Sequence, residues 1–327
     1  FALARVANPG TDAPVGDDNV AAARNFGTKL WNATRFALAN GASPALPMPS
    51  TPTDADTWIL GRMREVTEQV DALLEDFQFA KATEALYHFT WDELCDWYLE
   101  LAKPQLAAVE TADGTRAVLG HVLDVLVRLL HPISPFLTEA LYQALSGAVS
   151  VVVAPWPSAA GAHGVGVPVD AGAATRIADL QKLITDVRRF RTEQRVPDKR
   201  RVAARLRGLD EAGLGAHRAA LAALVRLDEP GAEFAPTAAV EVALSGARTV
   251  VVELDTSGAI DVAAERARLG RDLAAARKEL DQAERKLGNP AFVAKAPAHV
   301  VEDIRGRQVG AAADIERITA RLGALQA

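Results

Sequence analysis

The chain has 327 residues and a net charge of −6, with 49% hydrophobic and 24% charged residues. This composition excludes a largely disordered protein, and the length predicts two or three domains. The single cysteine, Cys95, excludes an internal disulfide and a cysteine-cluster zinc site. No apolar run approaches the roughly 18 residues that cross a bilayer, and the start carries no signal-peptide pattern, so we expect a cytoplasmic protein.

Residues 17–40 are predicted to form the first helix. Their apolar positions recur at spacings of three and four residues and therefore share one face: Phe26, Leu30, Ala33 and Ala37. A glycine and a proline-rich run end this helix. A second helix is predicted from Asp54, with Thr53 and Asp56 as a capping pair. Its apolar stripe is Ile59, Met63, Val66, Val70, Leu73 and Phe77.

Helical spacing continues over residues 79–109. A bend is expected near Thr90, which we expect to pair with Glu93 as a second capping pair.

A fourth helix is predicted to begin after the Asp113-Gly114 turn, with an inward face of Val118, Val122, Val125 and Leu129. It should break at His131-Pro132 and restart at Ser134-Pro135. Four long helices with short links indicate a helix bundle that ends near Gly147. The run VVVAPWP at residues 151–157 is then expected to be a short extended crossing.

The pattern changes between about residues 173 and 255. A helix to about Gln194 and another near Leu221 alternate with β-like runs at 202–206, 239–244 and 249–254. We expect a small α+β unit.

The last 67 residues have the most regular spacing in the chain. Steps of four and three residues define an apolar seam: Leu269, Leu273, Ala276, Leu280, Ala283, Leu287, and then Ile304, Ala311, Ile315, Ile318, Leu322 and Leu325. The seam is interrupted at Gly288-Asn289-Pro290, where a helix must stop. Two such helices should fold back as an antiparallel coiled coil, whose first arm would be about 40 Å long and would project from the body.

The segment RNFGTKLWNATRF at residues 24–36 places polar side chains along an arc of the first helix: Arg24, Thr28, Lys29, Asn32 and Arg35. Such an arc is suited to bond RNA bases and phosphates, although a solvated helix face is the simpler interpretation. Aromatic residues crowd the WDELCDWYLELAKPQL segment at 91–106. Trp91, Trp97 and Tyr98 are predicted to pack in the core rather than to stack on bases.

The spacing of residues in the sequence reveals no catalytic or metal-binding motif. Asp92, Asp96 and Glu100 share one helix with no nucleophile or histidine placed to use them, so we predict no acid-base role. His131 is predicted to be a hydrogen-bond partner at a helix break. A basic cluster follows later in the chain: Arg188, Arg189, Arg191, Arg195, Lys199, Arg200 and Arg201.

Three strings in this order resemble the anticodon-binding domain of the class I aminoacyl-tRNA synthetases for valine, isoleucine and leucine: RNFGTKLWNATRF, WDELCDWYLELAKPQL and LLHPISPFLTEALYQAL. The valyl enzymes in particular are similar at VVVAPWP and at KLGNPAFVAKAPAHVV, residues 286–301. Isoleucyl enzymes commonly carry a C-terminal cysteine zinc site, which one cysteine cannot build. The resemblance therefore favours the valyl-tRNA synthetase family.

The resemblance implies a mainly α fold. Residues 17–157 would be the class I synthetase anticodon-binding helix bundle, 158–258 a linker and small α+β junction domain, and 259–327 a C-terminal antiparallel coiled-coil hairpin that serves as a tRNA-binding arm. Because the chain begins at Phe1 without an initiator Met, we expect a fragment. Residues 1–16 would then be a linker from a catalytic domain outside it.

The resemblance also implies partners and site residues. The partners would be tRNA(Val) and the missing catalytic and editing domains of the same chain, in a monomer. The full ligase would join valine to tRNA(Val) using ATP with Mg²⁺; this segment lacks the HIGH-type and KMSKS-type motifs, so we expect it to bind tRNA without a cofactor or catalysis. Anticodon candidates are Arg24, Lys29, Asn32 and Arg35, and arm candidates are Arg277, Lys278, Arg285, Lys286 and Lys295.

Two alternatives stay open at this point. One is a helical scaffold whose terminal coiled coil recruits a protein partner through its apolar seam. The other is the equivalent region of an isoleucyl- or leucyl-tRNA synthetase.

Overall fold

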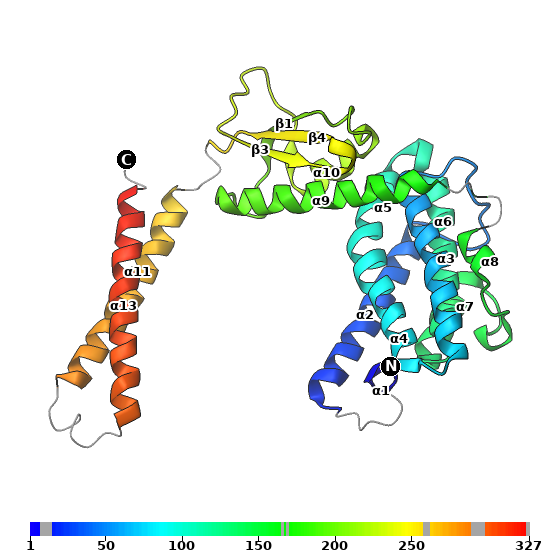
Figure 1. The fold of residues 1–327 in the computed structure, drawn as a ribbon, viewed down its shortest axis with the longest axis horizontal. Coiled ribbons are helices and arrows are strands. Elements are labelled where there is room, and N and C mark those ends of the chain that lie inside the picture. The colour runs from blue at the N-terminus through cyan, green and yellow to red at the C-terminus, as the bar shows by residue number, and fades with distance from the viewer. Residues whose placement is uncertain (7–14, 165–166, 168–169, 258–261, 289–297, 325–327) are drawn as a thin grey trace.

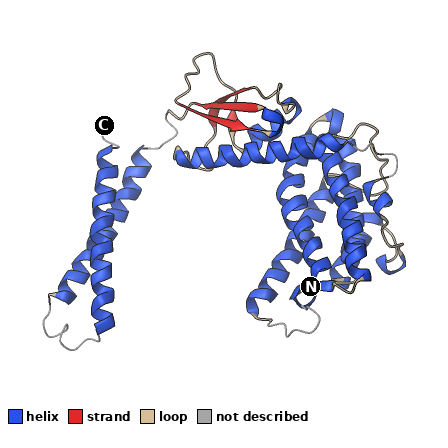
Figure 2. Cartoon of the chain, in the orientation of Figure 1, coloured by secondary structure: helices blue, strands red, loops and turns tan. Residues whose placement is uncertain are grey.

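The computed structural model describes residues 1–6, 15–164, 167, 170–257, 262–288 and 298–324. Most of these residues are helical, and the strands form one small sheet (Figures 1 and 2). The predicted mainly α fold is confirmed. Among the described residues, no helix is both long and apolar enough to cross a membrane.

The N-terminal part is a bundle of packed helices. The two predicted N-terminal helices are present, and the apolar face predicted for the first one is buried. The elements are α1 (Ala2–Val6), α2 (Asp17–Ala39), α3 (Asp54–Glu75), α4 (Phe79–His88), the π-helical η1 (Phe89–Tyr98), α5 (Leu99–Ala107), α6 (Val109–Leu130) and α7 (Pro135–Ser146).

The predicted cap of α3 is confirmed. Thr53 Oγ1 accepts a hydrogen bond from the Asp56 backbone N–H at 3.1 Å, and Asp56 Oδ2 accepts one from the Thr53 N–H at 3.3 Å. The extension of the apolar stripe to Phe77 is wrong, because α3 ends at Glu75 and the Phe77 side chain is 70% exposed. Its φ of 57° shows that the chain has already left the helix there.

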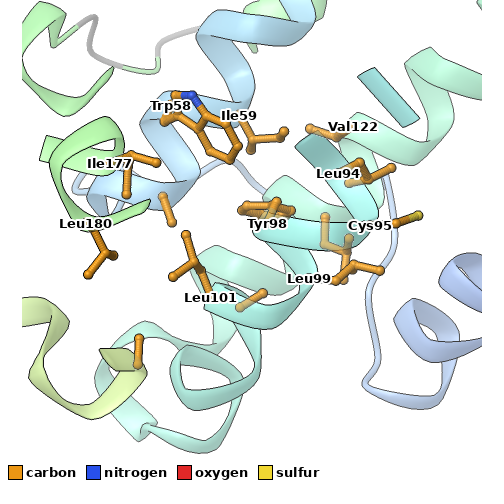
Figure 3. Close-up of a cluster of buried hydrophobic side chains, with 14 of the residues drawn as sticks. Trp58, Ile59, Leu94, Cys95, Tyr98, Leu99, Leu101, Val122, Ile177 and Leu180 are labelled. Carbon is orange, nitrogen blue, oxygen red and sulfur yellow. The ribbon is translucent and has the colours of Figure 1, made fainter. Parts of the chain in front are cut away.

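The predicted bend near Thr90 is a π-helical segment, η1. Because the helix continues through Thr90, its hydroxyl donates to the Leu86 carbonyl at 2.6 Å instead of capping a new helix. Glu93 binds Arg62 at 2.7 and 3.0 Å. The second capping pair is therefore wrong. At the end of η1 the fully buried Tyr98 lies among the apolar side chains of the bundle (Figure 3).

The predicted start of the fourth helix is also wrong. Helix α6 begins at Val109 and includes the Asp113-Gly114 pair that suggested a turn. A Cβ atom at Gly114 would lie 3.0 Å from the Pro49 Cβ, so close packing accounts for this glycine.

The predicted interruption after α6 is confirmed, since α7 starts at Pro135. His131 Nδ1 lies 2.8 Å from Thr138 Oγ1, which confirms its role as a hydrogen-bond partner at the break. Residues Val151–Val153 form a single 3₁₀ turn, η2, and not an extended crossing. The Ser150 hydroxyl stabilises that turn by accepting from the Val152 N–H at 3.2 Å.

The α+β unit follows, as predicted. Its strands pair in the order β2-β1-β4-β3, with β1 parallel to β2 and the other pairs antiparallel. One apolar core runs without a break from Phe26 in the bundle to Leu254 in the sheet, so the division into domains at residues 157 and 158 stays a prediction. The elements are α8 (Ala159–His163), α9 (Ala171–Glu193), β1 (Val202–Arg207), η3 (Gly215–His217), α10 (Arg218–Leu224), β2 (Leu227–Asp228), β3 (Ala238–Ala243), η4 (Ser245–Ala247) and β4 (Thr249–Leu254).

Two long helices, α11 (Val262–Leu287) and α13 (Ala298–Ala324), form the C-terminal hairpin. They pack against each other through seam residues that are buried: Leu269, Ala276, Ala283, Ile304, Ala311 and Ile318. The predicted antiparallel coiled coil is confirmed, and Figure 1 shows it standing apart from the bundle. Leu325 of the predicted seam lies outside the described residues.

Candidate nucleic-acid interface

Helix α2 presents a polar face on the side away from the core. Arg24, Asn32 and Arg35 are exposed, and within the described part of the chain neither arginine forms an ion pair. The Thr28 hydroxyl donates to the Arg24 carbonyl at 2.9 Å, so it is used within the helix. The two guanidinium groups and the Asn32 amide therefore remain available to a ligand.

Lys29 differs from the other anticodon candidates. Its Nζ lies 2.7 Å from Asp96 Oδ1 and 3.7 Å from the centre of the Trp91 ring, which in turn stacks on Tyr87. At 100° per residue, Lys29 is turned by about 140° from Arg24 around the helix axis. This rotation places Lys29 at the edge of the polar face. Its charge is already compensated by Asp96 within the bundle.

The sequence reasoning missed Trp31. Its side chain is 48% exposed, whereas Phe26 and Leu30 of the same helix are buried. Trp31 lies seven residues after Arg24 and four before Arg35, which places its indole between the two guanidinium groups on one face. Exposed aromatic rings stack on unpaired bases. The helical spacing of Trp31 from Arg24 and Arg35 could have identified this residue from the sequence.

The carboxylates of η1 and α5 do not form a pair. Asp92 binds His88 at 2.7 Å, Asp96 binds Lys29, and Glu100 binds Lys103 at 2.6 Å. Each of the three carboxylates thus has its own basic partner, and the absence of an acid-base role stays a prediction.

Among the aromatic residues predicted to pack in the core, Tyr98 is fully buried. Its hydroxyl donates to Asp56 Oδ1 at 2.7 Å, and Thr115 donates to Oδ2 of the same carboxylate at 3.2 Å. Burial raises the pKa of the Asp56 carboxyl, although these hydrogen bonds oppose the rise. Trp97 is partly buried against the same core.

The arm carries its candidates on α11. Arg277, Lys278, Arg285 and Lys286 are exposed, and Arg285 Nη2 lies 3.7 Å from Asp281 Oδ2. Lys295 lies outside the described residues.

Three basic residues of α11 follow each other at intervals of seven residues: Arg271, Lys278 and Arg285. A seven-residue step nearly completes two helical turns, so the three side chains form one ridge about 21 Å long. This basic ridge lies opposite the buried seam that starts at Leu269. Arg271 was not among the predicted arm residues, although the spacing shows it.

Two family models match this chain. The anticodon-binding domain of tRNA ligase matches residues 56–206, and the valyl tRNA synthetase tRNA binding arm matches residues 261–326. Over its full length the chain is 59% identical to the valine-tRNA ligase of Nocardia farcinica and 55% identical to that of Mycobacterium tuberculosis H37Rv. The chain belongs to the valyl-tRNA synthetase family. It spans 36% of the length of each of these relatives and corresponds to the C-terminal region of the family.

This valyl-tRNA synthetase region contains both parts that the resemblance implied. The arm match encloses the basic ridge, whereas the anticodon-binding match begins within α3 and leaves α2 outside it. The family membership implied by the sequence is confirmed. The assignment of individual side chains on α2 and α11 to RNA stays a prediction.

Proposed function

We propose that this chain is the tRNA-recognition region of a valine-tRNA ligase. The bundle receives the anticodon of tRNA(Val), and the arm contacts the outer corner of the same RNA. The observation that carries the proposal is the presence in one chain of an anticodon-binding match and a tRNA-binding-arm match, each beside exposed basic side chains.

On the bundle, the polar face of α2 supplies the chemistry for unpaired bases. Trp31 offers a flat apolar ring for stacking, while Arg24, Asn32 and Arg35 offer hydrogen-bond donors for base edges and phosphates. Lys29 contributes less, because its ammonium group is held by Asp96.

On the arm, the basic ridge contacts phosphates. Lys and Arg side chains that neutralise phosphates release counterions, so binding should weaken steeply with salt. The seam on the opposite side is buried within the hairpin, which leaves it unavailable to a protein partner. This burial favours the RNA-binding interpretation over the scaffold interpretation.

The rest of the ligase would select and activate valine with ATP and Mg²⁺ and edit errors. Valine and isoleucine differ by one methylene, worth about 1–3 kcal/mol in a pocket, so amino-acid choice needs a dedicated pocket and editing. The contribution of this region is the choice of tRNA. We infer a cytoplasmic monomer.

The test measures the dissociation constant for tRNA(Val) and for the same RNA with an altered anticodon, over a range of salt concentrations. Trp31→Ala should weaken binding about tenfold, in line with about 1–3 kcal/mol per stacked base, and reduce the preference for the native anticodon. Equal affinity of the unchanged chain for both RNAs would refute the role of the bundle.

The arm is tested with two charge-matched variants. Lys278→Gln/Arg285→Gln removes two charges from the basic ridge and should lower the slope of log K against log salt by about two. Arg305→Gln/Arg307→Gln removes two charges from α13 that already contact Glu302 and Asp303, and should have a smaller effect. If deleting residues 262–327 changes the oligomeric state and leaves RNA binding intact, the scaffold interpretation is correct instead.

A further inference from the structure

A second positively charged site lies in the α+β unit, at the end of α9 that is farther from the bundle. It is a pocket of about 380 Å³. Its lining consists of Arg188, Arg191, Thr192, Asp198, Leu224, Val225 and Arg226, and we call it the α9 pocket. Three guanidinium groups against one carboxylate give it a net positive charge.

Arg191 forms the floor of the α9 pocket and is only 5% exposed. Its guanidinium donates to three backbone carbonyls, those of Arg200 at 2.5 Å and of Pro197 and Arg226 at 3.4 Å. In the described part of the chain no carboxylate forms an ion pair with it, and burial lowers its pKa. Asp198 of the pocket lining attracts this charge without forming an ion pair with it. A buried positive charge whose hydrogen bonds go to carbonyl dipoles is only partly compensated and attracts an anion.

Arg188 and Arg226 stand at the mouth of the pocket. Both are exposed, and Arg188 Nη2 donates to the Leu224 carbonyl at 3.2 Å, which holds its guanidinium against the end of α10. Arg226 has a φ of 53°, and Arg195, just beyond α9, has a φ of 58°. Glycine is favoured where the chain takes a positive φ after a helix. An arginine at either position therefore costs backbone strain energy.

The surrounding charges fit an anionic ligand. Lys199 and Arg200 are exposed on the loop that follows α9, and Arg201 is held by Asp228 at 2.5 Å. Guanidinium groups match the geometry of phosphate oxygens and bind them with paired hydrogen bonds. Two residues of the basic cluster seen in the sequence, Arg188 and Arg191, therefore line the α9 pocket, and the fold adds Arg226 to them.

The position of the α9 pocket relates it to the RNA surfaces. Near its N-terminus α9 is attached to the bundle, where Arg176 binds Asp54 at 2.6 and 2.8 Å. Arg191 lies fifteen residues later, about 22 Å along the helix. In Figure 1 this end of α9 points to the side on which α11 and α13 lie.

We propose that the α9 pocket binds a backbone phosphate of the tRNA, as a third contact between the bundle and the arm. This proposal rests on the tRNA binding proposed above. Because a phosphate contact carries no base information, it should add affinity and leave the anticodon preference unchanged.

The test uses the full chain and the double variant Arg188→Gln/Arg226→Gly. Glycine suits the φ of 53°, so this variant should keep the wild-type circular dichroism and melting temperature. Affinity for tRNA(Val) at low salt should fall about tenfold, and the salt slope should fall by one to two. The matched control is Lys182→Gln/Arg189→Gln, which removes two charges of the same helix that are paired with Asp186 outside the pocket.

The outcomes separate this proposal from the previous one. If the double variant binds tRNA(Val) with the same affinity and salt slope as the control variant, the proposed role of the α9 pocket is refuted. This holds even if the α2 and α11 variants weaken binding. Inorganic phosphate tests whether the pocket binds free phosphate instead of an RNA phosphate. In that case phosphate would raise the melting temperature of the wild type but not of the double variant, and both chains would bind tRNA equally. This result would show that the proposal is wrong. A wild-type chain that binds no tRNA overturns both proposals.

Discussion

Replacing Asp54 with alanine removes the carboxylate that joins the bundle to the α+β unit. Asp54 is the first residue of α3, and its two oxygens accept hydrogen bonds from Arg176 of α9 at 2.6 and 2.8 Å. Asp54 Oδ2 also lies 3.0 Å from His217 Nε2. These three side chains are 22%, 28% and 6% exposed, so the ion pair is only partly screened by water. We expect the variant to weaken the attachment of the two parts.

The magnitude follows from these contacts. Breaking a fully buried ion pair costs about 3–5 kcal/mol, and hydrogen bonds to charged groups contribute about 1.5–3 kcal/mol. Because a quarter of the Asp54–Arg176 pair is exposed, we expect the lower part of this range, about 3 kcal/mol including the interaction of Asp54 with the helix dipole. For units of this size the melting temperature should fall by about 6–12 °C.

The assay is thermal and urea unfolding followed by two signals. All five tryptophans lie between residues 31 and 156, so their fluorescence reports on the bundle, whereas circular dichroism reports on the whole chain. The control is Asp18→Ala, which removes an exposed carboxylate from the first turn of α2 and should shift the midpoint by about 1–2 °C at most.

The pH dependence supplies the refuting result. Burial alone would raise the pKa of Asp54, but the hydrogen bonds from His217 and Arg176 outweigh it and lower the pKa below the ordinary value. A lowered pKa stabilises the fold above the unfolded value of about 4 and loses that effect as the pH falls. The stability difference between wild type and Asp54→Ala should be full at pH 7 and shrink below about pH 4. Equal stability at pH 7 would show that the carboxylate does not hold the two parts together.

Three further changes test local packing and charge. Gly120→Ala should destabilise the bundle by at least about 2 kcal/mol in urea unfolding, because its Cβ would lie 2.3 Å from the backbone of Ser43. Gly61→Ala meets no atom within 4 Å and should stabilise α3 by up to about 1 kcal/mol in the same assay. The Asp92 hydrogen bond raises the pKa of His88, so His88 should stabilise the fold fully below about pH 6.5 and lose this effect at higher pH. Melting temperatures of wild type and His88→Asn should therefore differ more at pH 6 than at pH 9.

Local signals in the sequence predicted most of the helices. The spacing of Phe26, Leu30 and Ala33 identified the buried face of α2, and Thr53 with Asp56 identified the start of α3. These predictions succeeded because helix periodicity and capping depend on residues only three or four apart. The coiled-coil seam of the arm was predictable for the same reason.

Predictions failed where a local signal had a tertiary cause. Gly114 resembled a turn residue, but the glycine is there because Pro49 packs against α6. Thr90 resembled a cap, but its hydroxyl bonds to the preceding turn of a helix that continues as η1. In both cases the same residue type serves two purposes, and only the neighbouring element decides which.

The sequence by itself determined the mainly α fold, the family and the hairpin. Each of these follows from the spacing of apolar residues along the chain or from contiguous sequence motifs. Tertiary structure alone decided which charges are free and which are bound. It brought Asp96 to Lys29 across 67 residues and the Arg226 carbonyl to Arg191 across 35. It left Trp31 half exposed between Arg24 and Arg35, which form no ion pair within the described residues. Such pairings depend on how distant elements pack, and a charge that is already compensated within the fold has little left to offer an RNA phosphate.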